Sequence, residues 1–164
     1  MGDSLLDPVV LDALLAAGIT HEVLACDPEL ADTAAFCEHY GVPVEQAANT
    51  ILVASKKVDP PRHAVCVVLG TTRLDVNRRV SELLGVKRLS FADADTTVAL
   101  TGMMIGGVTA FGIDGLPVYV DSAVLVAPQV VMGGGNRSSN LLLDPRELTK
   151  LPTVEVVEGL ALPR

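Results

Sequence analysis

Hydrophobic residues recur at helical spacing between Asp7 and Gly18, which predicts an amphipathic helix at the start of the chain. Asp7 suits the capping position, Pro8 the first helical position and Gly18 the position just past the end. The same pattern predicts further helices over 32–40, 75–84, 92–100 and 145–151, with one helical turn over 44–48.

Runs of β-branched and aliphatic residues predict strands, and a Pro-rich turn over 59–62 predicts a hairpin between two of them. The expected strands are 21–25, 49–55, 64–69, 116–120, 124–126, 129–132 and 139–143. Strands and helices interleave irregularly, and several strands follow one another through short turns. We therefore expect a mixed α/β (α+β) fold over 1–164 as a single domain, with a mixed, partly barrel-like sheet surrounded by helices.

Composition narrows the class of protein. Of the 164 residues, 49% are hydrophobic and only 3% aromatic, so the core must be aliphatic. No apolar run approaches the roughly 20 residues of a membrane span, and no signal peptide is visible. The cysteines, at 26, 37 and 66, lack CxxC spacing and suit a reducing compartment. We expect a cytoplasmic protein with no membrane partner.

The formal net charge of −8 argues against a long basic face for DNA or other nucleic acid. It allows contact with a nucleotide end. Local basic groups occur at 56–57, 73, 78–79 and 87–88, and solvated surface charge is their simplest interpretation.

Two glycine-rich segments are candidate ligand sites. Residues 101–112 (TGMMIGGVTAFG) have neither the GxGxxG spacing of a dinucleotide site nor the Gly-Lys-Ser/Thr of a phosphate loop. Residues 133–135 (GGG) precede Asn136 and Arg137, and such a loop could bind an anion. A plain tight turn remains the alternative for both segments.

The residues suited to metal or covalent chemistry do not form a set. Cys37 and His39 diverge on a predicted helix, no second cluster completes four ligands, and no serine lies in GxSxG. We expect no metal and no cofactor. Asp121 ends an apolar strand, where its carboxylate either faces a cleft or caps the turn at Ser122.

The order of several short motifs resembles the YbaK/ProX family, whose members also occur as an editing domain in bacterial prolyl-tRNA synthetases. The motifs are YGVP at 40–43, QAA at 46–48, TILV at 50–53, LLG at 83–85, TG at 101–102, GGVTAFG at 106–112, LPVYVD at 116–121 and GGG at 133–135. Together they span 32–151, most of the chain.

The resemblance implies a trans-editing hydrolase that cleaves the ester of a mischarged aminoacyl-tRNA, such as Ala or Cys on tRNA-Pro, without a metal or covalent nucleophile. It implies the aminoacyl-tRNA 3′ end as partner, with a synthetase as a further candidate and a monomer or homodimer as the assembly. The implied catalytic residues are Gly106, Gly107 and Asp121, with backbone amides of the glycines stabilising the oxyanion. The implied substrate-binding residues are Asn49, Thr50, Gly102, Val108, Thr109, Gly134 and Gly135.

Two positions depart from the family pattern. The lysine usual before the first strand is Asn49 here, which offers hydrogen bonds but no charge. The proline usual in the glycine segment is Ala110. Asn49 keeps a second hypothesis open, namely a non-catalytic module of the same fold that binds aminoacyl-adenosine or a synthetase.

Overall fold

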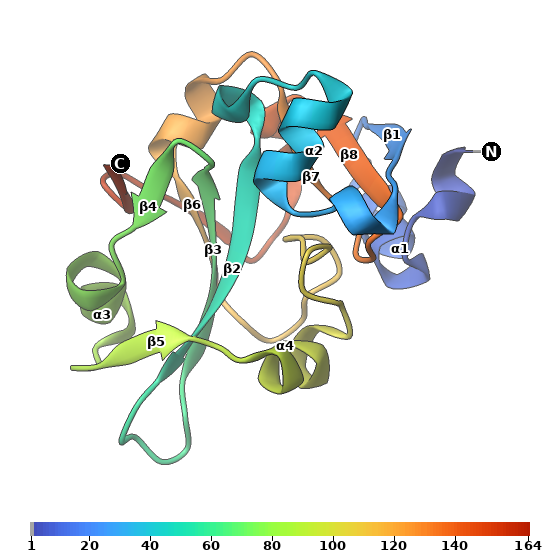
Figure 1. Ribbon diagram of the computed structural model, residues 1–164. Helices are drawn as coiled ribbons and strands as arrows, with labels where there is room; N and C mark the ends of the chain where they lie inside the picture. The colour runs from blue at the N-terminus through green and yellow to red at the C-terminus, as the bar shows by residue number, and fades with distance from the viewer. Residues whose placement is uncertain (1) are drawn as a thin grey trace.

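The computed structural model describes residues 2–164, and its helices and strands interleave along the chain (Figure 1). The α-helices are α1 (Pro8–Ala17), α2 (Thr33–Tyr40), α3 (Ser81–Leu84) and α4 (Ala94–Thr101). The strands are β1 (Glu22–Ala25), β2 (Ala48–Ser55), β3 (His63–Leu69), β4 (Thr72–Leu74), β5 (Leu89–Phe91), β6 (Val118–Asp121), β7 (Val130–Gly133), β8 (Ser139–Leu143), β9 (Val154–Val157) and β10 (Ala161–Pro163). Short 3₁₀ helices are η1 (Gly2–Leu5), η2 (Pro28–Leu30), η3 (Val44–Gln46), η5 (Ser122–Val126) and η6 (Pro145–Lys150), and η4 (Val76–Val80) is a π-helix.

The central sheet has five strands in the order β5-β2-β3-β6-β9. β2 pairs antiparallel with β3 from Ala48↔Leu69 to Ala54↔His63, which confirms the predicted hairpin. β6 then pairs parallel with both β3 and β9, and β5 pairs antiparallel with β2. The sheet is therefore mixed, and its two edge strands are β5 and β9.

A three-stranded sheet, β1-β8-β7, lies beside the start of β2 (Figure 1). A parallel bridge between Ala47 and Val131 joins the two sheets at this point. β4 and β10 form a separate antiparallel pair. The mixed α/β class is confirmed, and the described strands form open sheets with free edges.

Both faces of β3 are buried, as its continuous run of aliphatic residues predicts. Val65 and Val67 belong to the main core with Phe111, whereas Cys66 and Val68 belong to a second core on the other face. Alternation of side chains along the strand sends neighbouring residues to these two cores.

The ends of α1 follow the predicted signals. The Asp7 carboxylate accepts a hydrogen bond from the Val9 amide at 2.9 Å. Gly18 adopts a left-handed φ of +66°, and its amide donates to Leu15 while the Ile19 amide donates to Leu14. This is the glycine-terminated helix end that the sequence indicated.

Three expected elements differ in type. Residues 122–126 form the 3₁₀ helix η5 and no strand, because the chain turns immediately after β6. The helix expected over 75–84 is a π-helical turn followed by the four-residue α3, and 145–150 is 3₁₀. The short strands β4, β5, β9 and β10 carry too few residues for a periodic pattern. Within residues 2–164, no helix is long and apolar enough to cross a membrane.

Candidate functional site

A pocket of about 300 Å³ opens where the start of β2 meets α2, the glycine segment and the three-stranded sheet. Its lining residues are Ala31, Asp32, Thr33, Phe36, Cys37, Ala47, Ala48, Asn49, Thr50, Ile51, Ile105, Gly106, Val108, Val131, Met132, Gly133 and Asn140. The lining combines apolar side chains with a similar share of polar groups, which suits a small ligand that itself carries polar groups.

Asn49 is held in this pocket by α2. The Thr33 hydroxyl, in the first turn of α2, donates a hydrogen bond of 2.7 Å to Asn49 Oδ1. Asn49 Nδ2 has no hydrogen-bond partner among residues 2–164. Because Thr33 occupies the acceptor side of the amide, Asn49 presents its two N–H donors to a ligand.

The two glycine segments pack backbone against backbone beside the pocket, and each supplies one glycine, Gly106 or Gly133, to its lining. The Gly135 amide donates to the Gly107 carbonyl at 2.7 Å. A side chain on Gly107 would overlap the backbone of Asn136, and one on Gly133 would overlap the carbonyls of Gly107 and Val108. Glycine is required here because the two chains approach too closely for any Cβ.

Arg137 connects η2 to the glycine segment next to the pocket. Its Nε donates to the Pro28 carbonyl at 3.1 Å and its Nη1 donates to the Ile105 carbonyl at 3.0 Å. Nη1 also lies 3.6 Å from the Asp32 carboxylate. Gly106 has a φ of +93°, and a Cβ there would strike the Arg137 guanidinium. The Arg137 guanidinium is thus already paired with backbone carbonyls and a carboxylate of the protein itself.

The thiols near the site are poor nucleophiles. Burial raises the pKa of the Cys37 thiol, and the nearby Glu45 charge raises it further. Burial also raises the pKa of Cys66 to about 12. Both thiols are neutral near pH 7, whereas a thiolate is the reactive form. Among residues 2–164, no group of three or more His, Cys, Asp or Glu is placed to hold a metal ion.

The structure brings four of the ten expected site residues to the pocket: Asn49, Thr50, Gly106 and Val108. Gly107 is not in the lining, although its neighbours Gly106 and Val108 are, and its amide donates to the Met104 carbonyl at 2.9 Å. That amide is therefore already engaged, whereas the Gly106 amide has no partner in the described part of the chain. Of the two expected oxyanion donors, only Gly106 is free to act.

Four other expected residues lie outside the pocket lining. Gly102 ends α4 with a φ of +71°. Gly134 and Gly135 pack against the start of α1, where the Gly134 carbonyl accepts from the Asp7 amide at 3.0 Å. Thr109 is fully buried, and its hydroxyl has no hydrogen-bond partner among residues 2–164.

Asp121 is not part of the pocket, so the expectation that it shares a cleft with the glycine segment is not met. Its carboxyl is buried near the backbone amides of Ser122, Ala123, Leu160 and Ala161. Burial raises its pKa, and these amides oppose that effect because they favour the ionised form. The carboxyl therefore lies between the end of β6 and the segment that leads into β10, and its side chain does not cap η5.

Several lining residues have no counterpart in the sequence-based site. Asn140 is buried in the leucine-rich strand β8. A polar residue in such an apolar run is the one feature of the sequence that could have indicated a role for Asn140. Thr33 and Phe36 lie on one side of α2, three residues apart. Nothing in the local pattern indicated that this side faces the start of β2.

Comparison with known protein families identifies the domain that contains this pocket. The family model for the aminoacyl-tRNA editing domain matches residues 27–151, which contain the whole pocket. The chain belongs to the aminoacyl-tRNA editing domain family.

Solved structures share the fold over almost the full chain. A candidate trans-editing enzyme for prolyl-tRNA synthetase superposes with a TM-score of 0.78 at 26% identity, covering 93% of this chain and 97% of that one. The hypothetical protein APE2540 gives a TM-score of 0.81 at 27% identity, covering 94% and 99%. A candidate signal transduction protein from Marinobacter aquaeolei VT8 gives 0.65 at 16% identity, covering 96% of this chain but 31% of that one, and this likeness concerns the fold alone.

Proposed function

We propose that this protein is a trans-editing hydrolase that deacylates mischarged aminoacyl-tRNA. The observation that carries the proposal is the pocket at the start of β2, where Asn49 presents free N–H donors at the position of the family's lysine. The family match and the similarity to a candidate trans-editing enzyme for prolyl-tRNA synthetase support the same activity. Such a substrate also favours a cytoplasmic location.

The size and walls of the pocket favour a small aminoacyl group such as alanyl or cysteinyl, on tRNA-Pro or a similar tRNA. Its volume of about 300 Å³ must also admit part of the terminal ribose and the attacking water. Phe36 and Met132 are buried in the lining and limit the room for a larger side chain.

In the proposed reaction a water molecule adds to the ester carbonyl carbon, and the bond to the ribose oxygen breaks. The ribose oxygen leaves with a proton as the hydroxyl, and the free amino acid is released. The free Gly106 amide and the Asn49 Nδ2 group are the donors available to the developing oxyanion or the ribose. An oxyanion donor such as the Gly106 amide contributes about 2.7–4 kcal/mol to transition-state stabilisation in other hydrolases. A neutral hydrogen bond from Asn49 to the ribose contributes less, about 0.5–1.5 kcal/mol.

A second candidate is a non-catalytic module that binds aminoacyl-adenosine or a synthetase through the same pocket. The replacement of the family's lysine by Asn49 favours this alternative, because a neutral amide provides no charge for a phosphate or an oxyanion.

A deacylation screen over tRNAs mischarged with amino acids of increasing size separates the two candidates. We expect turnover of one or more small aminoacyl esters and none of phenylalanyl esters. Binding of a non-hydrolysable aminoacyl-adenosine analogue, with no turnover of any tRNA, would identify the binding module instead.

A further inference from the structure

The end of the central sheet farthest from the pocket carries an unusual concentration of positive charge. We define the basic end as Lys56, Lys57, Arg62, Lys87 and Arg88. All five side chains are exposed. With Asp59, the acidic residue in the hairpin turn, they give this end a charge of about +4, on a chain whose total is −8.

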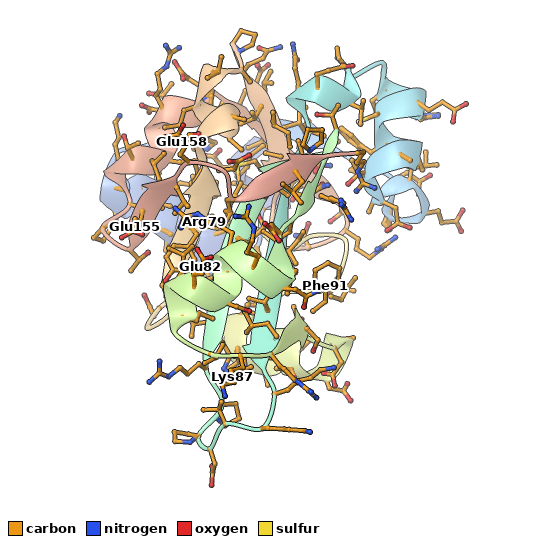
Figure 2. All side chains as sticks on the ribbon, turned by 90° about the vertical axis from the view of Figure 1, so that its left-hand side faces the viewer. Arg79, Glu82, Lys87, Phe91, Glu155 and Glu158 are labelled. Atoms are coloured by element: carbon orange, nitrogen blue, oxygen red, sulfur yellow. The ribbon has the colours of Figure 1, made fainter. Side chains whose placement is uncertain are left out.

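Strand pairing holds the two halves of the basic end together. Ser55 of β2 pairs with Leu89 of β5, and the Lys56 amide donates to the Arg88 carbonyl at 2.9 Å. Arg62, just before the return strand β3, donates through Nη1 to the Leu84 carbonyl at 2.7 Å. Figure 1 shows the β2–β3 hairpin projecting beyond β5, and Figure 2 shows Lys87 just above that hairpin.

Within residues 2–164 the five cations have no carboxylate partner, whereas most other cations of this protein have one. The chain has 12 Lys and Arg residues, and in the described part five of the seven outside the basic end form ion pairs with carboxylates. None of the five in the basic end does so. In an acidic protein, clustering cations without counter-charges raises the electrostatic free energy unless an external anion compensates.

The backbone of the hairpin turn has an unusual conformation at Lys57. Lys57 is the one non-glycine residue in the described chain with a positive φ, at +58°. Glycine or asparagine occupies that conformation at lower cost, since a Cβ there costs about 1–2 kcal/mol. The turn nevertheless places a lysine at the tip, beside Lys56.

Between the basic end and the pocket lies an apolar hollow with an exposed aromatic ring. The hollow has a volume of about 260 Å³, and it shares Thr50, Ile51, Ile105 and Val108 with the pocket. Phe91, which pairs with Val53 midway along β2, lines it and is 62% exposed. Figure 2 shows the Phe91 ring projecting from the side of the molecule, on the pocket side of Lys87.

We propose that the basic end binds the phosphate backbone of the RNA whose 3′ end enters the pocket, with Phe91 as a stacking platform for a base between the two. This inference rests on the proposed function, which places the 3′ end of the RNA in the pocket and so directs the rest of the strand towards the basic end. Lys56 follows directly after β2 and lies seven residues from Asn49, which is about 23 Å at roughly 3.3 Å per residue. An RNA strand that reaches from the pocket to the basic end therefore contacts the protein over several nucleotides. Phosphate-binding cations aligned with an exposed aromatic ring are the pattern of single-stranded RNA recognition.

The test measures the affinity of the full chain for an uncharged RNA hairpin with a single-stranded 3′ overhang, over a series of salt concentrations. The test variant combines Lys57→Gln, Lys87→Gln and Arg88→Gln, leaving Arg62 and its backbone hydrogen bond intact. The matched control is Arg73→Gln, an exposed cation without an ion pair on β4, away from the basic end. Phe91→Ala tests the stacking platform.

We expect the triple variant to bind the RNA at least tenfold more weakly, and its plot of log affinity against log salt to be less steep by about 2. Arg73→Gln should leave both quantities nearly unchanged, and Phe91→Ala should weaken binding by roughly tenfold with an unchanged salt slope. An unaltered affinity in the triple variant, an equal loss in Arg73→Gln, or equally tight binding of polyglutamate by the wild type would overturn the proposal.

Turnover is measured separately, on mischarged tRNA and on an aminoacyl-adenosine ester. The triple variant should lose kcat/KM on the tRNA and keep it on the small ester. If the wild type hydrolyses neither substrate yet binds RNA through the basic end, the proposed hydrolase is wrong and the RNA surface stands. If it hydrolyses both and the triple variant retains full activity on tRNA, the RNA surface is wrong and the hydrolase stands.

Discussion

The Thr33 hydroxyl donates to Oδ1 of Asn49 across 2.7 Å, and this contact fixes which side of the Asn49 amide faces the pocket. Thr33→Val removes the donor and keeps the side-chain shape. The amide can then turn its oxygen towards the pocket, so we expect deacylation to fall about three- to tenfold, consistent with a neutral hydrogen bond worth about 0.5–1.5 kcal/mol. An unchanged rate, with a melting temperature like that of the wild type, would show that Thr33 does not orient Asn49.

Gly107 and Gly102 make a matched pair for the packing of the glycine segments. A Cβ at Gly107 would overlap the backbone of Asn136, whereas a Cβ at Gly102 meets no atom within 4 Å. Gly102→Ala should cost about 1 kcal/mol of unfolding free energy, because its φ is +71°. Gly107→Ala should cost more than about 2 kcal/mol, since backbone must move. Urea denaturation of both variants measures this difference, and equal costs would contradict the close packing.

Local signals in the sequence were sufficient for many elements of the fold. The capped helix α1 and the hairpin β2–β3 follow from residues within or next to each element. The short strands β5 and β9 could not be found this way, because each is defined by pairing with a strand distant in sequence. The five-residue η5 has the composition of a strand, and its position after β6 makes it a turn.

Some residues of the candidate site could likewise be predicted from local signals, whereas others depend on contacts between distant segments. The motifs predict Asn49 and Gly106 as site residues, and both line the pocket. Asn140 was missed because its access to the pocket depends on how the β1-β8-β7 sheet meets β2. Asp121 lies outside the pocket lining, near the backbone amides of Leu160 and Ala161, and no local pattern reveals this proximity to a segment far along the chain.

Asp121 should affect stability, with a defined pH dependence. Burial raises its pKa in the folded state above the usual 3.8, so the folded protein binds this proton more tightly than the unfolded chain does. Stability from this group is fully present below pH 3.8 and is lost as the pH rises through the raised pKa. The wild type should therefore exceed Asp121→Asn in unfolding free energy by more at pH 3.5 than at pH 7. A difference that grows with pH would contradict this assignment, and kcat should be unchanged by the substitution.

Cys37 lines the pocket but should not take part in the chemistry. Its raised pKa keeps the thiol protonated near neutral pH. Cys37→Ser should therefore keep kcat within about threefold, with any loss appearing in KM or stability. A loss of turnover in folded protein would indicate a thiol role and would remove the basis for a mechanism without a covalent nucleophile.

We propose that the pocket hydrolyses an aminoacyl ester with Asn49 acting as a neutral hydrogen-bond donor. The most direct measurement is the deacylation rate of the wild type, Asn49→Ala and Asn49→Lys on one mischarged tRNA at two salt concentrations. We expect an active wild type, a loss of about tenfold in Asn49→Ala, and equal or higher activity with steeper salt dependence in Asn49→Lys. An inactive wild type with turnover only in Asn49→Lys, or three indistinguishable rates, would contradict the account.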